Sequence, residues 1–289
     1  MNQKIPPSTI NMRQLLWLTL LLPWLIGCET WTLRQATEDT LRLPSEDTGR
    51  TYEITVLLPP GYDEAQTYPS VYLIDGHWHY YNVAGDAQQL MEAGEIEDII
   101  LVSIAYADLV PNSLSGYAEI SRLRIDDLTA VKNTPEAERG GGAEAFRRFI
   151  AQDLIPAIEA DYSTSAQRRT LMGHSLGGYF GLWEMYTRGD TSLFENIEAG
   201  SPALWWADGH LMALLDEVEA EGRPQPFDLH TTMGTMETVT WNAFFDEFEA
   251  RLDTYDLPGL TYTVERYPKG HTANAEPGFR EGLKYFFGQ

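Results

Sequence analysis

The sequence predicts an α/β fold with a mostly parallel central sheet. Apolar, β-branched segments alternate with amphipathic segments of helical length from Thr51 to the end of the chain, a pattern typical of parallel strands covered by helices. The 289 residues are 43% hydrophobic and show no internal repeat or low-complexity tract. This composition is sufficient for a buried core, and it excludes a disordered or fibrous chain.

Three strands are expected in the first part of this domain, at Thr51–Pro59, Tyr68–Asp75 and Ile96–Tyr106. All three are rich in the β-branched and aromatic residues that favour strands. The first ends at a Pro-Pro-Gly turn and the second at a glycine, both of which interrupt regular structure. The polar segment Ala107–Gly142 is too long for a routine connection, so we expect a loop that borders a site.

A helix is predicted over Ala143–Tyr162, because its apolar residues recur at helical spacing and form one face. These are Phe146, Phe149, Ile150, Leu154, Ile155 and Ile158. We expect this face to pack on the sheet. The remaining predicted strands are Arg169–Gly173, Phe194–Ala199, Phe227–Met233 and Leu260–Tyr267, and the remaining helices are Leu176–Arg188, His210–Glu219, Thr240–Tyr255 and Pro277–Phe287.

The charge and cysteine content restrict the classes of function. Acidic residues outnumber basic ones by 43 to 20, which gives a formal charge of −23. A surface this acidic does not favour phosphate backbones, so nucleic-acid binding is excluded. The single cysteine excludes an intramolecular disulfide and a thiolate metal cluster.

The N-terminal segment has the pattern of an export signal. An apolar run at Leu15–Ile26 follows Arg13, with Met12 as an alternative start. The run spans about 12 residues, whereas a membrane-spanning helix needs about 20. Its end, Leu-Ile-Gly-Cys, resembles the lipobox of bacterial lipoproteins, which implies that Cys28 is lipidated and becomes the first mature residue. The alternative is an ordinary signal peptide followed by an incidental cysteine.

We therefore expect a signal peptide at 1–27, a mature N-terminal segment at 28–50 and one folded domain at 51–289. The protein is expected to be exported and to associate with the membrane through the lipid on Cys28. The resemblance to lipoproteins also bears on location, because Glu29 stands where an aspartate retains lipoproteins at the inner membrane of enteric-type bacteria. In a host with two membranes, this implies the periplasmic face of the outer membrane.

A Gly-x-Ser-x-Gly motif marks the candidate nucleophile, Ser175. The motif lies between the strand Arg169–Gly173 and the helix Leu176–Arg188. A nucleophile at such a tight turn needs small neighbours, and the turn raises its hydroxyl above the sheet. The alternative is a glycine-rich turn with an inert serine.

The base and the acid should follow the nucleophile along the chain, in the order Ser, acid, His. Of the downstream histidines, His210 opens a predicted helix and His230 lies within a strand. His271 follows the last strand in a predicted loop, so it is the expected base. Glu237 is the first carboxylate after the strand Phe227–Met233 and is the expected acid. Asp246 and Glu247 remain alternatives on the following helix.

Two backbone amides are expected to form an oxyanion hole. One is the N–H of Leu176, directly after the nucleophile, and the other is the N–H of His77, after the strand Tyr68–Asp75. The side chains of His77 and His79 are interpreted as walls of the site, because no third metal ligand accompanies them. We therefore expect no metal site, and the sequence also lacks a phosphate-binding loop.

These residues together resemble the "putative esterase" family of α/β-hydrolases, and in particular its siderophore esterases. The resemblance is carried by YPSVYLIDG at 68–76, RIDDLT at 124–129, the helix at 142–162, RRTLMGHSLGGYFGLW at 168–183, AGSPALWW at 199–206, GTME at 234–237 and KGH at 269–271. It implies an α/β-hydrolase fold with helices on both faces of the sheet. It also implies cofactor-independent hydrolysis of a carboxyl ester, with Ser175, His271 and Glu237 as the triad.

The resemblance leaves the substrate open. Arg124, Trp205 and Trp206 belong to family elements near the pocket. The arginine suits an anionic or catecholate group and the tryptophans suit an aromatic acyl group, but both types serve equally well to hold a fold together. We expect a small-molecule ester as substrate. The alternatives are feruloyl or acetyl esters of polysaccharides, a thioester, acyl transfer to an alcohol, or a non-catalytic binding lipoprotein on the same scaffold.

Overall fold

The computed structural model describes residues 36–289. The expected signal peptide and Cys28 lie outside the described residues. The described part contains an eight-stranded sheet in the order β1-β2-β4-β3-β5-β6-β7-β8. The strands are β1 (Thr37–Ser45), β2 (Arg50–Leu58), β3 (Tyr68–Leu73), β4 (Ile100–Tyr106), β5 (Thr164–His174), β6 (Asn196–Gly200), β7 (Asp228–Gly234) and β8 (Thr261–Tyr267).

The sheet is mostly parallel, which confirms the predicted fold class. β1 pairs antiparallel with β2, and β2 pairs antiparallel with β4. All pairs from β4 across to β8 are parallel. Their carboxyl ends therefore meet at one edge, the edge where sheets of this kind bind ligands.

The sheet begins earlier than the boundary expected at Thr51. That position lies within β2, and β1 adds an edge strand from residues assigned to a separate N-terminal segment. β1 is mostly exposed and carries charged residues such as Glu38 and Arg42, so it lacks the apolar pattern of the buried strands. Charged side chains on an edge strand discourage pairing with other chains.

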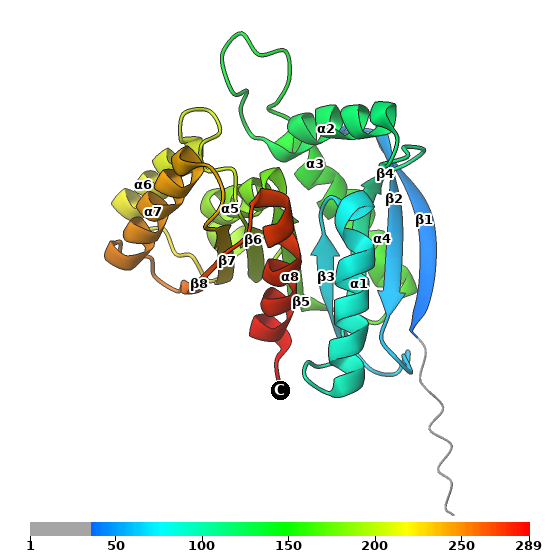
Figure 1. Cartoon of the computed structure of the whole chain (residues 1–289). Helices are drawn as coiled ribbons and strands as arrows, with labels where there is room; N and C mark the ends of the chain where they lie inside the picture. Colours follow the sequence, from blue (N-terminus) through cyan, green and yellow to red (C-terminus); the bar gives the residue numbers. More distant parts are fainter. Residues whose placement is uncertain (1–35) are drawn as a thin grey trace, which may run out of the picture. The chain divides into compact units, whose positions relative to one another are not determined.

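Helices cover both faces of the sheet, as Figure 1 shows. α1 (Gly76–Ala93) and α8 (His271–Phe287) pack on one face, where residues such as Val83 and Phe279 join one buried cluster. The other helices contribute to a second cluster. They are α2 (Leu114–Leu128), α3 (Ala143–Phe149), α4 (Ile155–Asp161), α5 (Leu176–Arg188), α6 (His210–Glu221) and α7 (Val239–Thr254).

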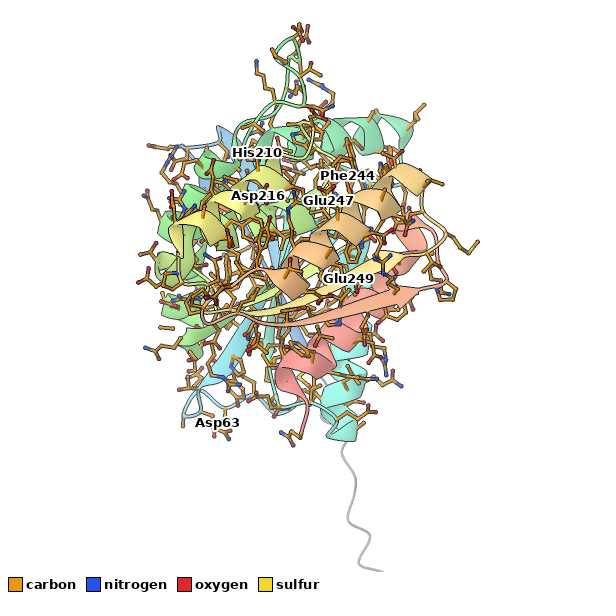
Figure 2. The ribbon with its side chains drawn as sticks, turned by 90° about the vertical axis from the view of Figure 1, so that its left-hand side faces the viewer. Asp63, His210, Asp216, Phe244, Glu247 and Glu249 are labelled. Atoms are coloured by element: carbon orange, nitrogen blue, oxygen red, sulfur yellow. The ribbon has the colours of Figure 1, made fainter. Side chains whose placement is uncertain are left out.

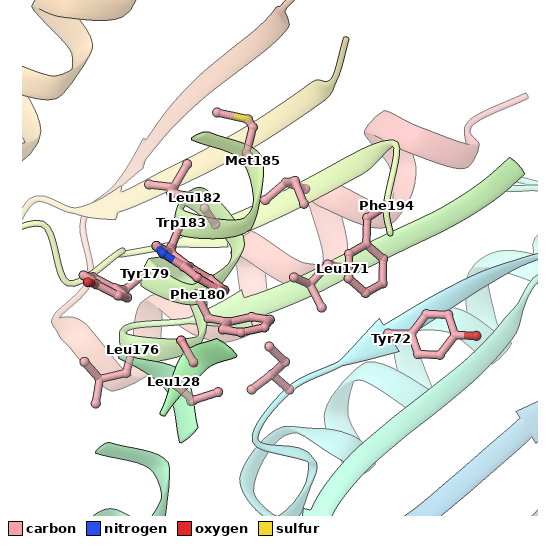
Figure 3. Packing of buried hydrophobic residues seen from close by; sticks show 14 of the residues in the cluster. Tyr72, Leu128, Leu171, Leu176, Tyr179, Phe180, Leu182, Trp183, Met185 and Phe194 are labelled. Carbon is pink, nitrogen blue, oxygen red and sulfur yellow. The ribbon is translucent and has the colours of Figure 1, made fainter. Parts of the chain in front are cut away.

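The part of the larger cluster around α5 lies between that helix and the sheet (Figure 3). Leu171 of β5, Tyr72 of β3, Phe180 of α5 and Phe194 all belong to it, and the rings of Tyr72 and Phe194 lie edge to face at 5.7 Å. Every residue of α5 from Leu176 to Tyr186 is buried. The helix that follows the candidate nucleophile is thus held rigidly against the centre of the sheet.

Three helical features differ from the sequence predictions. α1 was not expected, because its aromatic-rich first turns lack a clear helical pattern. α2 lies within the segment Ala107–Gly142, which was expected to be a loop; Ile120 and Leu128 are its buried apolar residues, too few for a recognisable stripe. The helix predicted over Ala143–Tyr162 contains a π-helical turn at Ile150–Leu154, directly before the turn that holds Pro156, which cannot donate a helical hydrogen bond.

Candidate active site

The three candidate catalytic residues lie at the carboxyl edge of the sheet. Ser175 directly follows β5, Glu237 follows β7, and His271 follows β8. The three residues are far apart in the sequence, but the parallel pairing of β5 to β8 places the ends of these strands side by side. The order Ser, acid, His therefore becomes a spatial cluster.

Ser175 occupies a strained turn between β5 and α5. Its φ of 61° and ψ of −114° lie in a region that residues with a side chain rarely adopt. The turn is held by the Ser175 N–H, which donates to the carbonyl of Gly200 at 2.8 Å. A Cβ atom at Gly173 would lie 2.4 Å from the backbone of Gly177. The glycines of the motif thus allow the close approach of strand and helix that this turn requires.

Glu237 and His271 form a hydrogen-bonded pair. Nδ1 of His271 lies 2.6 Å from Oε2 of Glu237. The other carboxylate oxygen, Oε1, accepts from the Gly234 N–H at 3.0 Å and from the Ser201 hydroxyl at 2.6 Å. The side chain of Glu237 has no exposed surface, whereas 29% of the His271 side chain is exposed. A donating Nδ1–H leaves Nε2 with a lone pair that can accept a proton.

His271 was expected in a loop. It is instead the first residue of α8. The helix was predicted to begin at Pro277, but it begins at His271 and includes that proline. Asn274 and Ala275, in the part of the helix that was missed, are buried. Thr272 and Ala273 are exposed, so the early part of the helix has no local apolar pattern, and the sequence offered only Pro277 as a start signal.

Other aromatic rings surround His271. The His174 ring lies 4.7 Å away between centroids, and the Trp241 ring lies edge to face at 4.9 Å. Burial, together with the nearby His271, lowers the pKa of His174 well below its ordinary value. Burial likewise lowers the pKa of His79 to about 4. Both side chains are therefore neutral at pH 7, and His271 faces no second cation from them.

A cavity of about 390 Å³ opens beside the nucleophile and the base. Its walls come from α1, α2, the turn between β5 and α5, and the first half of α8. The lining residues are Trp78, His79, Asn82, Val83, Tyr117, Ser121, Arg124, His174, Ser175, His271, Thr272, Ala273, Ala275, Glu276 and Phe279. Trp78 and Tyr117 face each other across α1 and α2 with ring centroids 5.5 Å apart. The cavity is thus mixed in character, with aromatic walls and one arginine.

The two expected oxyanion amides lie at the starts of helices. Leu176 begins α5, and His77 is in the first turn of α1. Among the described residues, neither N–H donates to a backbone carbonyl, as expected for the first turn of a helix. The His77 side chain does not line the main cavity, contrary to its expected role as a wall. It lies against Tyr106 in a smaller separate pocket, whereas His79 does line the main cavity.

Arg124 is held by a buried carboxylate and also lines the cavity. Its Nε lies 3.1 Å from both oxygens of Asp75, and its Nη2 lies 2.5 Å from Oδ2. Burial alone would raise the pKa of Asp75, but the charge and hydrogen bonds of Arg124 lower it below the ordinary value. The guanidinium also lies 5.3 Å from the centroid of the Trp78 ring. Arg124 thus links α2 to the start of α1 at the cavity wall.

The structure separates the two tryptophans that were expected near the pocket. Trp206 is buried, and its Nε1–H donates to the Val131 carbonyl at 2.8 Å. Trp205 is only partly buried and stacks on Trp241 of α7, with ring centroids 5.7 Å apart and planes 7° apart. Because Trp241 contacts His271, Trp205 reaches the site through this stack. Neither Trp205 nor Trp206 lines the cavity itself.

The alternative acids and histidines lie elsewhere. Asp246 pairs with Arg266, and Glu247 pairs with Arg251 on the exposed side of α7. Figure 2 shows this face, with Glu247 on α7 beside α6. His210 contacts the Tyr179 hydroxyl through Nδ1 at 2.7 Å. The other downstream histidine, His230, is buried against Glu198.

Several residues of the site were not identified from the sequence. Trp78, Tyr117, His174, Ser201 and Trp241 contact the triad or line the cavity, and Asn274 donates a hydrogen bond to Ser201 behind the acid. His174 and Ser201 stand beside recognised motifs, so their position next to Ser175 and within AGSPALWW was a usable signal. Trp241 lies on a predicted helix, where a tryptophan is most often a core residue.

Within residues 36–289, no group of three or more His, Cys, Asp or Glu side chains is arranged to hold a metal ion. In the same part of the chain, no helix combines the length and apolarity needed to cross a membrane.

The "Putative esterase" family matches residues 45–275. Ferri-bacillibactin esterase BesA of Bacillus subtilis is 30% identical over 207 residues, which cover 68% of this chain and 69% of the relative. The siderophore triacetylfusarinine C esterase of Aspergillus fumigatus is 32% identical over 181 residues, which cover 60% of this chain but only 58% of the relative. Both relatives carry names of siderophore esterases.

The same similarity extends to solved structures. An IroE-like serine hydrolase from Shewanella oneidensis superposes with a TM-score of 0.74 at 25% identity, covering 88% of this chain and 80% of that one. The α/β-hydrolase fold expected from the sequence is thereby confirmed, as is the expected similarity to siderophore esterases.

Proposed function

The chain belongs to the "Putative esterase" family, and from this premise we propose that it hydrolyses carboxyl esters through an acyl-enzyme on Ser175. The observation that carries the proposal is the hydrogen bond between Glu237 and the imidazole of His271. The same imidazole lines the cavity that Ser175 lines. A nucleophile on a strained turn, a base beside it and a buried acid behind the base form the arrangement that activates a serine.

In the proposed mechanism, the Ser175 hydroxyl attacks the ester carbonyl and transfers its proton to Nε2 of His271. Glu237 holds the imidazole in the Nδ1–H tautomer and stabilises the positive charge that forms on it. The amides of Leu176 and His77 stabilise the tetrahedral oxyanion, at about 3 kcal/mol per donor. His271 then protonates the leaving alcohol, and water hydrolyses the acyl-enzyme by the reverse proton path.

For the substrate we propose siderophore-type or other aromatic acyl esters. The two curated relatives above are named as esterases of siderophores. The cavity supports this class, because Trp78 and Tyr117 provide aromatic walls and Arg124 provides a positive charge for an anionic or catecholate group. The Trp205–Trp241 stack does not line the cavity, but it contacts His271 through Trp241 and is a second aromatic surface next to the base.

An activity screen tests both levels of the proposal. The full-length protein and its Ser175→Ala variant are assayed on p-nitrophenyl esters, feruloyl esters and a catecholate trilactone with and without iron. We expect hydrolysis by the wild type, no turnover by the variant and a preference for aromatic acyl groups. Equal rates of hydrolysis by the wild type and the variant would show that Ser175 is not the nucleophile. A preference for short acetyl esters would overturn the proposed substrate class, and activity only with an added alcohol would indicate an acyltransferase.

We also propose that the protein is exported and anchored by a lipid on Cys28, at the periplasmic face of the outer membrane in a host with two membranes. The support is the apolar run that ends at the only cysteine, followed by Glu29. Mass spectrometry of the mature N-terminus, with a Cys28→Ala control, tests this. Acyl chains on Cys28 are expected in the wild type, and a free cysteine there would overturn the proposal.

A further inference from the structure

A buried chain of hydrogen bonds continues from the acid of the site into the protein. The hydroxyl of Ser201 donates to Oε1 of Glu237 at 2.6 Å, on the side of the carboxylate away from His271. The amide Nδ2 of Asn274 donates to Oγ of Ser201 at 2.8 Å and to Oγ1 of Thr232 at 3.1 Å. Ser201 is 3% exposed, and both Asn274 and Thr232 are fully buried.

The donors and acceptors of these side chains fix the direction in which the hydrogen bonds run. The ionised carboxylate of Glu237 only accepts, so it needs the hydrogen of Ser201. Because the Asn274 NH₂ group already donates to the Ser201 oxygen, the Ser201 hydrogen is free to point at Glu237. The opposite orientation of the Asn274 amide would place a competing acceptor against that hydrogen. The bonds therefore run from Asn274 through Ser201 to Glu237, which in turn accepts from His271.

The position of Ser201 also connects the acid to the nucleophile. Ser201 follows Gly200, whose carbonyl accepts the Ser175 N–H at 2.8 Å, and the Ser201 N–H donates to the Thr232 carbonyl at 2.8 Å. Its φ is +39°, a conformation that costs energy for a residue with a side chain. Glycine would adopt this backbone more readily. The turn by itself would therefore favour glycine, and the Ser201 hydroxyl is not needed to form it.

From this geometry we infer that Ser201 and Asn274 are positioning residues, which hold the Glu237 carboxylate in the orientation that His271 needs. This inference rests on the proposed function and deepens it. Ser201 supplies the hydrogen bond that keeps Oε2 directed at Nδ1 of His271, and Asn274 fixes the direction of that hydrogen bond. Neither residue lines the cavity, so neither is expected to contact substrate.

The test compares Ser201→Ala, Ser201→Gly and Asn274→Asp in the full-length protein. Both serine variants lose the hydroxyl, but only glycine relieves the positive φ. We expect kcat to fall by roughly tenfold or more in both, with KM within twofold, because a hydrogen bond to a charged group is lost. Ser70→Ala is the matched control: Ser70 is fully buried in β3, near its amino-terminal end, and we expect wild-type kinetics.

The pH profile distinguishes positioning from a general structural defect. Loss of a donor to the anion increases the proton affinity of the Glu237–His271 pair, so the acid limb of kcat/KM should move to higher pH in both serine variants. Asn274→Asp adds a negative charge and a competing acceptor, so the acid limb of kcat/KM should move to still higher pH than in the serine variants. His271 also faces His174 and shares the cavity with Arg124 and Glu276, and all three are unchanged in the variants.

A failure of the positioning role can be distinguished from a failure of the proposed function. An unchanged kcat and acid limb in both serine variants, or full activity in Ser201→Gly alone, overturns the positioning role. If the wild type hydrolyses no ester, the proposed function fails, and NMR of the His271 Nδ1–H proton decides the inference without substrate. We then expect faster solvent exchange of that proton in both serine variants than in the wild type. An unchanged exchange rate overturns the inference.

Discussion

Nδ1 of His271 lies 2.6 Å from Oε2 of Glu237, although the whole of α7 and the whole of β8 lie between the two residues in the sequence. The acid is completely buried and the imidazole is partly exposed. The imidazole therefore connects a desolvated anion on one side with a solvent-accessible cavity on the other. An electrostatic contact of this kind is stronger than it would be in water.

Replacement of Glu237 by glutamine should reduce kcat by two to four orders of magnitude, roughly the range for an acid that orients a catalytic histidine. The amide cannot stabilise the imidazolium, and its NH₂ group would oppose the Nδ1–H. Glu247→Gln is the control, since Glu247 is an exposed carboxylate of α7 that pairs with Arg251. Steady-state kinetics with circular dichroism to verify folding check the prediction. A wild-type kcat in Glu237→Gln would contradict it.

Replacement of Arg124 by glutamine should lower the free energy of unfolding by about 3–5 kcal/mol, because it leaves the buried Asp75 without its cation. Arg122→Gln, two residues earlier on the same helix, changes an exposed pair with Glu119 and should have little effect. Urea unfolding of both variants measures the difference. If the Arg124 variant is as stable as wild type and only KM changes, Arg124 serves in binding and its contribution to the fold is minor.

Trp205 and Trp206 should respond differently to substitution. Trp206→Phe removes a buried hydrogen bond to the Val131 carbonyl and should lower the free energy of unfolding by about 1–3 kcal/mol, with little change in substrate preference. Trp205→Ala removes the stacking partner of Trp241 and should raise KM for aromatic acyl esters more than for acetyl esters. Urea unfolding and kinetics on paired substrates check this. The same kinetic effect from both variants would contradict it.

The stability of the protein should fall as the pH decreases from about 6.5 towards 4, in part because of His77. Burial lowers the pKa of His77 to about 4, and both ring nitrogens lack hydrogen-bond partners among the described residues. The folded state then binds fewer protons than the unfolded state in this window, so stability increases with pH and is fully present above about 6.5.

The change for this one residue is at most about 3 kcal/mol across the window. His77→Gln keeps the backbone N–H but has no side chain that titrates, so its stability curve should be flatter between pH 4 and 6.5. Urea unfolding of wild type and variant at several pH values measures the two slopes. Parallel curves over the whole range would show that His77 does not carry the effect.

The helix next to Ser175 and the buried parts of the strands were predicted well, because buried strands and helices impose strong local patterns. The strand before Ser175 was expected at Arg169–Gly173, but β5 already begins at Thr164, because its first residues are mostly exposed. The helix Leu176–Arg188 has the predicted bounds. The edge strand β1 and the helix α2 were missed because they bury few apolar side chains. The start of α8 was misplaced because only Asn274 and Ala275 are buried before Pro277, and two buried residues do not form a recognisable helical pattern.

The sequence alone established the α/β class, the motif around Ser175 and the order of candidate acid and base, since each depends on residue type and spacing near one position. Only the tertiary structure brought Glu237 to His271 and separated Trp205 from Trp206. It also revealed the chain from Asn274 through Ser201. These relationships depend on which strand ends meet at one edge of the sheet, and that arrangement is a property of long-range packing.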